Sequence, residues 1–254
     1  MRKLILQNVG YFRGMDGSLT DTCMKWPRFL YAPPSVQRAA MDEFKALVER
    51  ERPDSIFLTE VHQGALDNGY LDQAATLGAK HAYEKAIVKY DPKTAYERLW
   101  FFSGKSNAYF GEAPRSIEHF FLSEGAKRLV MTVHLDWARV YLVHLATLSA
   151  PMRARQMAEI ARMIPKRGRT IVCGDFNVFG GVGELQPLLD AGLVLVDSAP
   201  TFPASLPRYP LDLFLVSPAL AARARARVIA GVRYSDHLPV ILELYDSGYT
   251  VPRA

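Results

Sequence analysis

Short apolar runs that predict β-strands alternate with helical patterns along the whole chain, and no Gly/Ser-rich linker or block of charge divides it. This alternation constrains the fold most, because interleaved strands and helices pack as an α/β structure. The composition, with 49% hydrophobic and 22% charged residues, supplies enough apolar side chains for a substantial core. We therefore expect one domain over residues 1–246 and a C-terminal tail over 247–254.

The apolar runs also indicate how the strands are arranged. Two of them, 128–135 and 139–146, are separated by only three residues, so they must be antiparallel and the sheets must be mixed. Ten predicted strands with helices to cover them fit two packed sheets better than one. The predicted strands are 3–8, 55–59, 80–88, 97–103, 128–135, 139–146, 169–174, 193–197, 211–217 and 239–245.

Three segments have helical spacing and recognisable ends. Apolar residues recur every three or four positions over 36–51, before Pro53, and over 152–164, before Pro165. A short helix is predicted over 184–192, where Pro187 is tolerated in the first turn and Gly192 forms the C-cap.

Several classes of protein are disfavoured. The longest apolar runs are far shorter than the ~20 residues of a membrane-spanning helix, and the N-terminus reaches polar residues too early for a signal peptide. Cys23 and Cys173 form no disulfide framework or zinc motif, which favours a reducing, cytoplasmic location.

The formal net charge of +5 and the pI of about 9.2 favour an anionic partner, such as a nucleic acid, a phosphorylated metabolite or an anionic membrane surface. The charge is spread along the chain. We interpret its one basic cluster, Arg223, Arg225 and Arg227, as a solvated face.

The segment 170–177 has the strongest chemical signal. Its apolar strand ends in Gly174, Asp175 and Asn177, and the carboxyl ends of strands display ligand-binding and catalytic groups in α/β sheets. Asp175 can take a proton from water, while Asn177 can donate hydrogen bonds to an oxyanion. An ordinary strand-to-turn cap would use the same residue types.

Two further segments place polar groups beside strands. Glu60 follows the apolar run 56–58 and fits a magnesium ligand, because Mg²⁺ prefers one or two carboxylates plus water and substrate phosphate. Asp236 and His237 precede the last predicted strand, and an imidazole beside a carboxylate suits proton transfer or phosphate contact.

Six segments with polar residues follow one another along the chain; they contain Asn8, Glu60, His144, Gly174-Asp175-Phe176-Asn177, Asp212 and Ser235-Asp236-His237-Leu238-Pro239. In this order they resemble the endonuclease/exonuclease/phosphatase superfamily, which includes deoxyribonuclease I-like nucleases. The similarity covers residues 3 to about 245. Weaker matches are Asn107, within Ser-Asn-Ala-Tyr, and Arg128, at the start of a predicted strand.

The resemblance implies a four-layer α/β/β/α sandwich of two mixed β-sheets, with loops from both sheets meeting over a Mg²⁺ or Mn²⁺ ion. It also implies a role for each matching residue. Glu60 would be the main metal ligand, assisted by Asn8 and Asp236; Asp175 would orient and deprotonate water; Asn177 and His144 would contact the scissile phosphate; His237, held by Asp212, would polarise it; and Asn107 and Arg128 would bind the substrate phosphate.

Similar Val-His-Leu stretches contain His134 and His144, but one site cannot use both. His134 lies beside the predicted hairpin turn at 136–138, and His144 lies roughly 20 Å beyond it at ~3.3 Å per residue. His144 is followed by the loop before the helix at 152, so it belongs to the loop-bearing end, and we interpret His134 as structural.

Together these features predict a metal-dependent hydrolase that cleaves a phosphodiester or phosphomonoester by water attack. Alternatives are a DNA nuclease of the apurinic-site or deoxyribonuclease type, a lipid headgroup phosphodiesterase, or a non-catalytic binding module on the same fold. We expect a monomer whose substrate choice lies in the segments least like the shared motifs. Residues 16–34 and 83–100 mix cations and aromatic residues, as single-strand nucleic-acid platforms do, but the same residues could simply cap the core. For 16–34 we favour the core-capping interpretation.

Overall fold

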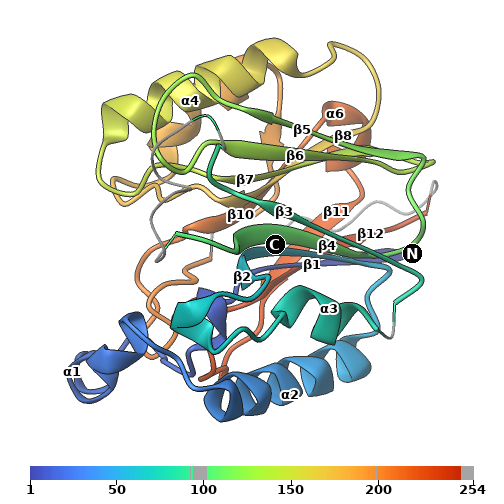
Figure 1. Ribbon diagram of the computed structural model, residues 1–254. Helices are drawn as coiled ribbons and strands as arrows, with labels where there is room; N and C mark the ends of the chain where they lie inside the picture. The colour runs from blue at the N-terminus through green and yellow to red at the C-terminus, as the bar shows by residue number, and fades with distance from the viewer. Residues whose placement is uncertain (80, 92, 94–101, 198, 247–254) are drawn as a thin grey trace.

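The computed structural model describes residues 1–79, 81–91, 93, 102–197 and 199–246. Within them, two six-stranded mixed sheets pack face to face, and helices cover both outer faces (Figure 1). The predicted four-layer, deoxyribonuclease I-like sandwich is confirmed.

The first sheet has the strand order β11-β12-β1-β2-β4-β3. Its parallel pair is β1 with β2, and its other neighbours are antiparallel. Its strands are β1 (Arg2–Asn8), β2 (Ser55–His62), β3 (Tyr83–Val88), β4 (Lys105–Gly111), β11 (Ala224–Val228) and β12 (Val240–Leu244).

The second sheet has the order β5-β6-β7-β8-β10-β9. Here β7 and β8 form the parallel pair, and the remaining pairs are antiparallel. Its strands are β5 (Ser116–Phe121), β6 (Leu129–His134), β7 (Arg139–His144), β8 (Thr170–Asp175), β9 (Val194–Leu195) and β10 (Asp212–Val216).

Helices cover the sheets from opposite sides (Figure 1). The first sheet packs on α2 and α3, and the second on α4 and α5. The helices are α1 (Leu19–Lys25), α2 (Pro34–Glu51), α3 (Gln73–Gly78), α4 (Ala150–Met163), α5 (Gln186–Asp190) and α6 (Pro218–Ala221), with 3₁₀ turns η1 (Gly10–Phe12), η2 (Trp26–Phe29), η3 (Leu66–Asn68) and η5 (Val182–Leu185).

Alternation along the strands divides the core into layers. In β1, Leu4 and Leu6 face the central layer between the sheets, while Ile5 faces the helices on the other side. Successive side chains of a strand point to opposite faces, so a strand between two apolar layers is apolar at every position. The continuous run in β1 is therefore the pattern of a strand buried on both faces.

Most of the predicted elements are found, with small shifts at their ends. Strands β4, β5 and β11 and helices α1, α3 and α6 were not predicted, and the strand expected at 97–103 falls largely outside the described residues, as does the expected tail. Of the arginines interpreted as a solvated face, Arg225 is exposed and Arg223 and Arg227 are half-buried. Arg227, on β11, also forms ion pairs with Glu51 and Glu243. The described helices include none with the length and hydrophobicity of a transmembrane span.

Candidate active site

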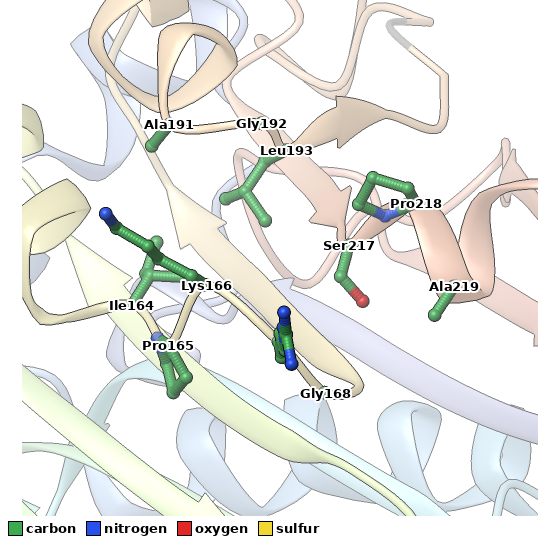
Figure 2. Close-up of a pocket in the computed structure, with 11 residues that line it drawn as sticks. Ile164, Pro165, Lys166, Gly168, Ala191, Gly192, Leu193, Ser217, Pro218 and Ala219 are labelled. Atoms are coloured by element: carbon green, nitrogen blue, oxygen red, sulfur yellow. The ribbon is translucent and has the colours of Figure 1, made fainter.

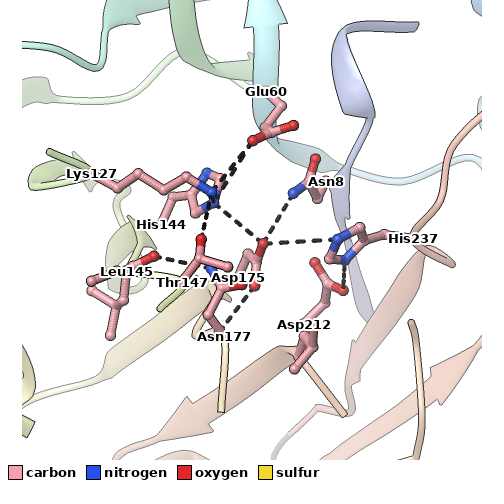
Figure 3. Close-up of polar contacts among 12 residues, drawn as sticks. Asn8, Glu60, Lys127, His144, Leu145, Thr147, Asp175, Asn177, Asp212 and His237 are labelled. Carbon is pink, nitrogen blue, oxygen red and sulfur yellow. Dashed lines mark hydrogen bonds and ion pairs between the residues drawn. The ribbon is translucent and has the colours of Figure 1, made fainter. Parts of the chain in front are cut away.

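Polar side chains meet at the carboxyl ends of the two parallel strand pairs. Asn8 ends β1, Glu60 lies near the end of β2, and His144 and Asp175 end β7 and β8. Figure 3 shows that they point toward one another across the gap between the sheets. The structure thus brings together groups separated by up to 167 residues in the chain.

Asp175 is at the centre of this cluster. It is paired in register with His144 on one side and with Asp212 on the other, so three strands present polar residues at one level. Its Oδ2 accepts a hydrogen bond from Nδ2 of Asn8 at 3.0 Å, and its Oδ1 accepts one from the backbone N–H of Asn177 at 3.0 Å. Burial raises the pKa of Asp175 to about 6, against the lowering effect of His237.

Gly174 explains how β8 reaches this position. Its φ is +150°, and a Cβ there would lie 1.9 Å from the backbone oxygen of Val143. Only glycine allows the two strands to approach so closely. The glycine of the Gly-Asp-Phe-Asn motif therefore sets the position of the aspartate that follows it.

His237 and Asp212 form a buried pair beside Asp175. Nδ1 of His237 is 2.7 Å from Oδ2 of Asp212, and Nε2 is 4.0 Å from Oδ2 of Asp175. Thr201 donates a 2.7 Å hydrogen bond to the same Asp212 oxygen. Burial lowers the pKa of His237, but Asp212 and Asp175 outweigh it and raise that pKa to about 10, so the imidazole is protonated at neutral pH.

Gln7 holds the backbone of His237 in place. Its amide donates a 3.0 Å hydrogen bond to the His237 carbonyl oxygen and accepts one of 2.8 Å from the hydroxyl of Tyr234. The residue before Asn8 thus connects β1 to the loop that carries the histidine.

Glu60 lies in a β-bulge where the pairing of β2 with β4 shifts between Leu58 and Val61. Its φ is +58°, an uncommon conformation for glutamate that often marks a functional position. Burial alone would raise its pKa, but Lys89 and Lys127, with Nζ atoms 3.4 and 3.6 Å from Oε1, hold the pKa well below its usual range.

The remaining predicted residues differ in how they contribute. Asp236 lies beside Gly10, and burial followed by the nearby Glu60 raises its pKa against the opposing effect of His237. Asn177 uses its side-chain amide to donate to the Leu145 carbonyl oxygen at 3.0 Å, so it braces the neighbouring loop.

Asn107 and Arg128 have different surroundings. Asn107 is fully buried on β4, and neither polar atom of its side chain has a hydrogen-bond partner. Arg128 is 2.6 Å from Asp91 and also donates to the Leu122 carbonyl oxygen. Its chain neighbour Lys127, shown in Figure 3, does reach the cluster, 3.6 Å from Oε1 of Glu60.

Sequence reasoning assigned neither lysine of the cluster to the site, although Lys89 lies in the segment 83–100 that it considered for substrate choice. Lys89 follows β3, is 1% exposed, and donates a hydrogen bond to the hydroxyl of Tyr11. A lone lysine carries no motif, so only the packing of β3 beside β4 and β2 shows that it lies at Glu60. Lys127 had one available signal, since it directly precedes the matched Arg128.

Other histidines and a surface hollow are separate from this cluster. His134 lies at the opposite end of β6, in register with Arg139, as the turn position predicts. His62 is buried and is bonded to Asp67 at 3.0 Å. Figure 2 shows a hollow of about 330 Å³ lined by Lys166, Leu193 and Ser217 among others, at the ends of β8 and β10 away from Asp175 and Asp212.

Asp175, Asp212 and His237 also place potential ligand atoms within 4.8 Å of one another, as a metal site would. The bond between Asp212 and His237 uses Nδ1 of the imidazole and Oδ2 of the carboxylate, and Oδ1 of Asp212 has no hydrogen-bond partner. A protonated imidazole cannot bind a metal. While His237 is protonated, the trio therefore offers only the carboxylate oxygens of Asp175 and Asp212 as ligands.

The family model for the endonuclease/exonuclease/phosphatase family matches residues 31–237. The chain belongs to this family. Members of the family are hydrolases that act on phosphoesters. The comparison with curated proteins gave no match.

Solved structures of similar fold span nearly the whole chain. An endonuclease/exonuclease/phosphatase from Beutenbergia cavernae is 18% identical with a TM-score of 0.70, covering 96% of this chain and 71% of its own. The 3′ phosphatase NExo from Neisseria, bound to a product DNA hairpin, is 18% identical with a TM-score of 0.63 and coverage of 96% and 100%. An AP endonuclease from Archaeoglobus fulgidus is 15% identical with a TM-score of 0.61 and coverage of 96% and 99%.

Proposed function

We propose that this protein is a divalent-metal-dependent phosphoesterase that hydrolyses its substrate by direct attack of water. One observation carries the proposal: the Asp175 carboxylate is held by Asn8 and the Asn177 N–H, with the His237–Asp212 pair on one side and Glu60 nearby. A base, a cationic imidazole and a metal-binding carboxylate in one place are the groups that water attack on a phosphoester needs.

The residues around Glu60 fit Mg²⁺ or Mn²⁺. Glu60, Asn8 and Asp236 would supply oxygen ligands, which hard cations prefer. Glu60 raises the pKa of Asp236, so the two carboxylates repel each other and a shared cation would relieve that repulsion. When bound, the metal would polarise a phosphoryl oxygen and lower the pKa of water.

The protein's own groups divide the remaining work. Asp175, whose pKa is about 6, is mainly ionised at neutral pH and can accept a proton from the attacking water. Asn8 and the Asn177 N–H fix its orientation. The protonated His237 stabilises negative charge on the phosphoryl oxygens, and Asp212 keeps it protonated and oriented.

A substrate panel tests this function. Purified protein with Mn²⁺ would be incubated with abasic DNA, plasmid DNA, RNA, sphingomyelin, inositol phosphates, p-nitrophenyl phosphate and bis-p-nitrophenyl phosphate. The Asp175→Asn variant would be tested in parallel. We expect metal-dependent hydrolysis of at least one substrate, abolished by chelation and by Asp175→Asn. Failure of every substrate, with a folded protein, would argue for a binding module instead.

A second candidate, a nuclease acting on DNA, is favoured by an exposed aromatic surface. Trp26, Phe29 and Tyr31 are 56%, 51% and 49% exposed. The guanidinium of Arg13 lies between the rings of Phe29 and Tyr11, 5.5 and 4.7 Å from their centres, and so links this surface to the site. Exposed rings can stack on unpaired bases. Fluorescence anisotropy with single-stranded DNA should show weaker binding for Trp26→Ala/Phe29→Ala than for Met163→Ala, a change at an exposed apolar residue at the end of α4.

A further inference from the structure

Lys127 places an ammonium group inside the candidate active site. Its Nζ is 2.6 Å from Nε2 of His144, 3.0 Å from Oγ1 of Thr147 and 3.6 Å from Oε1 of Glu60. The Lys127 side chain is 24% exposed, whereas that of Lys89, on the same glutamate, is 2% exposed. Of these two cations, Lys127 is therefore the one that a ligand can reach.

The contact with His144 changes what that histidine can do. An ammonium group only donates hydrogen bonds, so Nε2 of His144 accepts and the imidazole is neutral. Burial, with Lys127 and Lys89 close by, holds the His144 pKa well below its usual range. Because Nε2 of His144 accepts a hydrogen bond, the group that can donate one to a ligand on this side of the site is Lys127.

The charges around the site indicate what kind of anion it suits. Nζ of Lys127 lies 3.6 Å from Oε1 of Glu60, so a phosphate bound by a metal on Glu60 would also lie beside this ammonium group. The Coulomb attraction between two groups grows with their charges, so a phosphomonoester dianion gains more from Lys127 than a phosphodiester monoanion does. The site therefore favours the dianion.

We propose that Lys127 binds the phosphate of the substrate directly and makes this site prefer phosphomonoesters to phosphodiesters. This inference rests on the proposed function and specifies its substrate class. In the reaction, the oxygen of water bonds to phosphorus as the ester P–O bond breaks. Asp175 takes a proton from the attacking water, the ester oxygen leaves with the bonding electron pair and takes up a proton from solvent to become an alcohol, and inorganic phosphate is released.

Ligand binding tests the inference without catalysis. Isothermal titration calorimetry in the presence of Mg²⁺ would compare inorganic phosphate with dimethyl phosphate, a diester monoanion. We expect the wild type to bind phosphate about tenfold or more tightly than dimethyl phosphate. Lys127→Met should weaken phosphate binding roughly 10- to 100-fold, the loss expected for one hydrogen bond to a charged group.

Two variants control for folding and for total charge. Lys166→Met removes an exposed lysine near the start of β8, at the end of the strand away from Asp175, and should leave both affinities unchanged. Lys127→Arg keeps the charge and should retain most of the preference for phosphate. If Lys127→Met weakens both ligands equally, or if the wild type binds dimethyl phosphate as tightly as phosphate, the inference is wrong.

Kinetics then separate this inference from the proposed function. We expect kcat/KM to be higher for p-nitrophenyl phosphate than for bis-p-nitrophenyl phosphate, and Lys127→Met to lower the first far more than the second. Preferential hydrolysis of the diester would overturn the inference while supporting the phosphoesterase. Loss of phosphate binding in Lys127→Met without hydrolysis of any substrate would support the Lys127 site and contradict the phosphoesterase.

Discussion

At the scale of single residues, the site depends on groups whose ionisation is set by their neighbours. Asp175 is buried, yet it must be ionised to accept a proton, and its hydrogen bonds with Asn8 and Asn177 favour the ionised form. His237 is buried as a cation because Asp212 and Asp175 face it. Removing one member of such a set should therefore disturb the others.

Replacing Asp175 by asparagine should abolish hydrolysis and preserve the fold. The change removes the base while keeping the shape, so single-turnover rates should fall about 10²–10⁴-fold. Burial raises the pKa of Asp175 to about 6, which means that ionising it in the folded protein costs stability at neutral pH. Asparagine avoids that cost, but it has one acceptor oxygen for the two N–H groups bound by Asp175 and leaves His237 with one anion fewer. Urea denaturation should therefore still show a cooperatively folded protein. A folded variant retaining more than a tenth of the wild-type rate would remove Asp175 from the role of base.

The His237–Asp212 pair should behave as one unit in kinetics. Asp212→Asn leaves His237 without its strongest anionic partner, so both single variants should lose the same protonated imidazole. Their losses should not add in the Asp212→Asn/His237→Ala double variant, because coupled residues give non-additive free energies. If the free-energy losses of the two single variants added up to that of the double variant, the two residues would act independently.

The raised pKa of His237 predicts how the stability of the protein depends on pH. Nitrogen NMR of the metal-free protein should show His237 titrating near pH 10, and Asp212→Asn should lower that value. A folded-state pKa above the usual 6.5 means that the contribution of His237 to stability is complete below pH 6.5 and is lost as the pH rises toward 10. Urea unfolding at pH 6 and pH 10 should therefore differ more for the wild type than for His237→Ala. An ordinary pKa in the wild type would contradict this.

At the scale of elements, the bulge in β2 and the close approach of β7 and β8 determine where the carboxylates lie. Both depend on backbone conformations that most residues avoid, at Glu60 and Gly174. Strain of this kind persists where the surrounding structure imposes it, and it is common at functional sites.

Gly174→Ala should destabilise the protein strongly. The added methyl would meet the Val143 carbonyl oxygen at 1.9 Å, and backbone cannot move aside as a flexible side chain can. Gly168→Ala is the control, because Gly168 also has a positive φ, +114°, but has nothing within 4 Å of its Cβ position. We expect a loss of about 3 kcal/mol or more for Gly174→Ala, against about 1 kcal/mol for Gly168→Ala, by urea unfolding. Similar losses would mean that β8 can shift freely.

The sequence predicted a helix, strand or turn best where a local pattern is compatible with only one of them. The apolar run of β8, the spacing of α2 before Pro53 and the short turn between β6 and β7 each have few alternative interpretations. The pattern was weaker for β5, whose residues are largely exposed, and for β11, where arginines alternate with small residues. Motifs located the side chains at the strand ends, but Lys89 and Lys127 join the site through tertiary packing, which no local pattern records.

At the scale of the whole molecule, each sheet supplies a different half of the site. The proposed metal ligands Asn8, Glu60 and Asp236 all belong to the first sheet or its loops, whereas Asp175 and His144 belong to the second. The hydrogen bond from Asn8 to Asp175 joins the two halves. Catalysis in this arrangement requires the apolar layer between the sheets to hold their relative position.

The proposed metal ligands come together only in the folded protein, so a bound metal should stabilise the folded state. Mn²⁺ at 100 times its dissociation constant should add about 2.7 kcal/mol to the free energy of unfolding. For a domain of this size, that is a rise of roughly 5–10 °C in Tm. Glu60→Gln, which removes the proposed principal ligand, should abolish the rise, while Glu43→Gln, an exposed change on α2, should keep it. Differential scanning calorimetry with and without Mn²⁺ measures the rise directly, and calorimetric titration gives each dissociation constant. An equal rise in Glu60→Gln and wild type at equal Mn²⁺ would place the metal elsewhere, because the wild-type carboxylate would then contribute nothing to its binding.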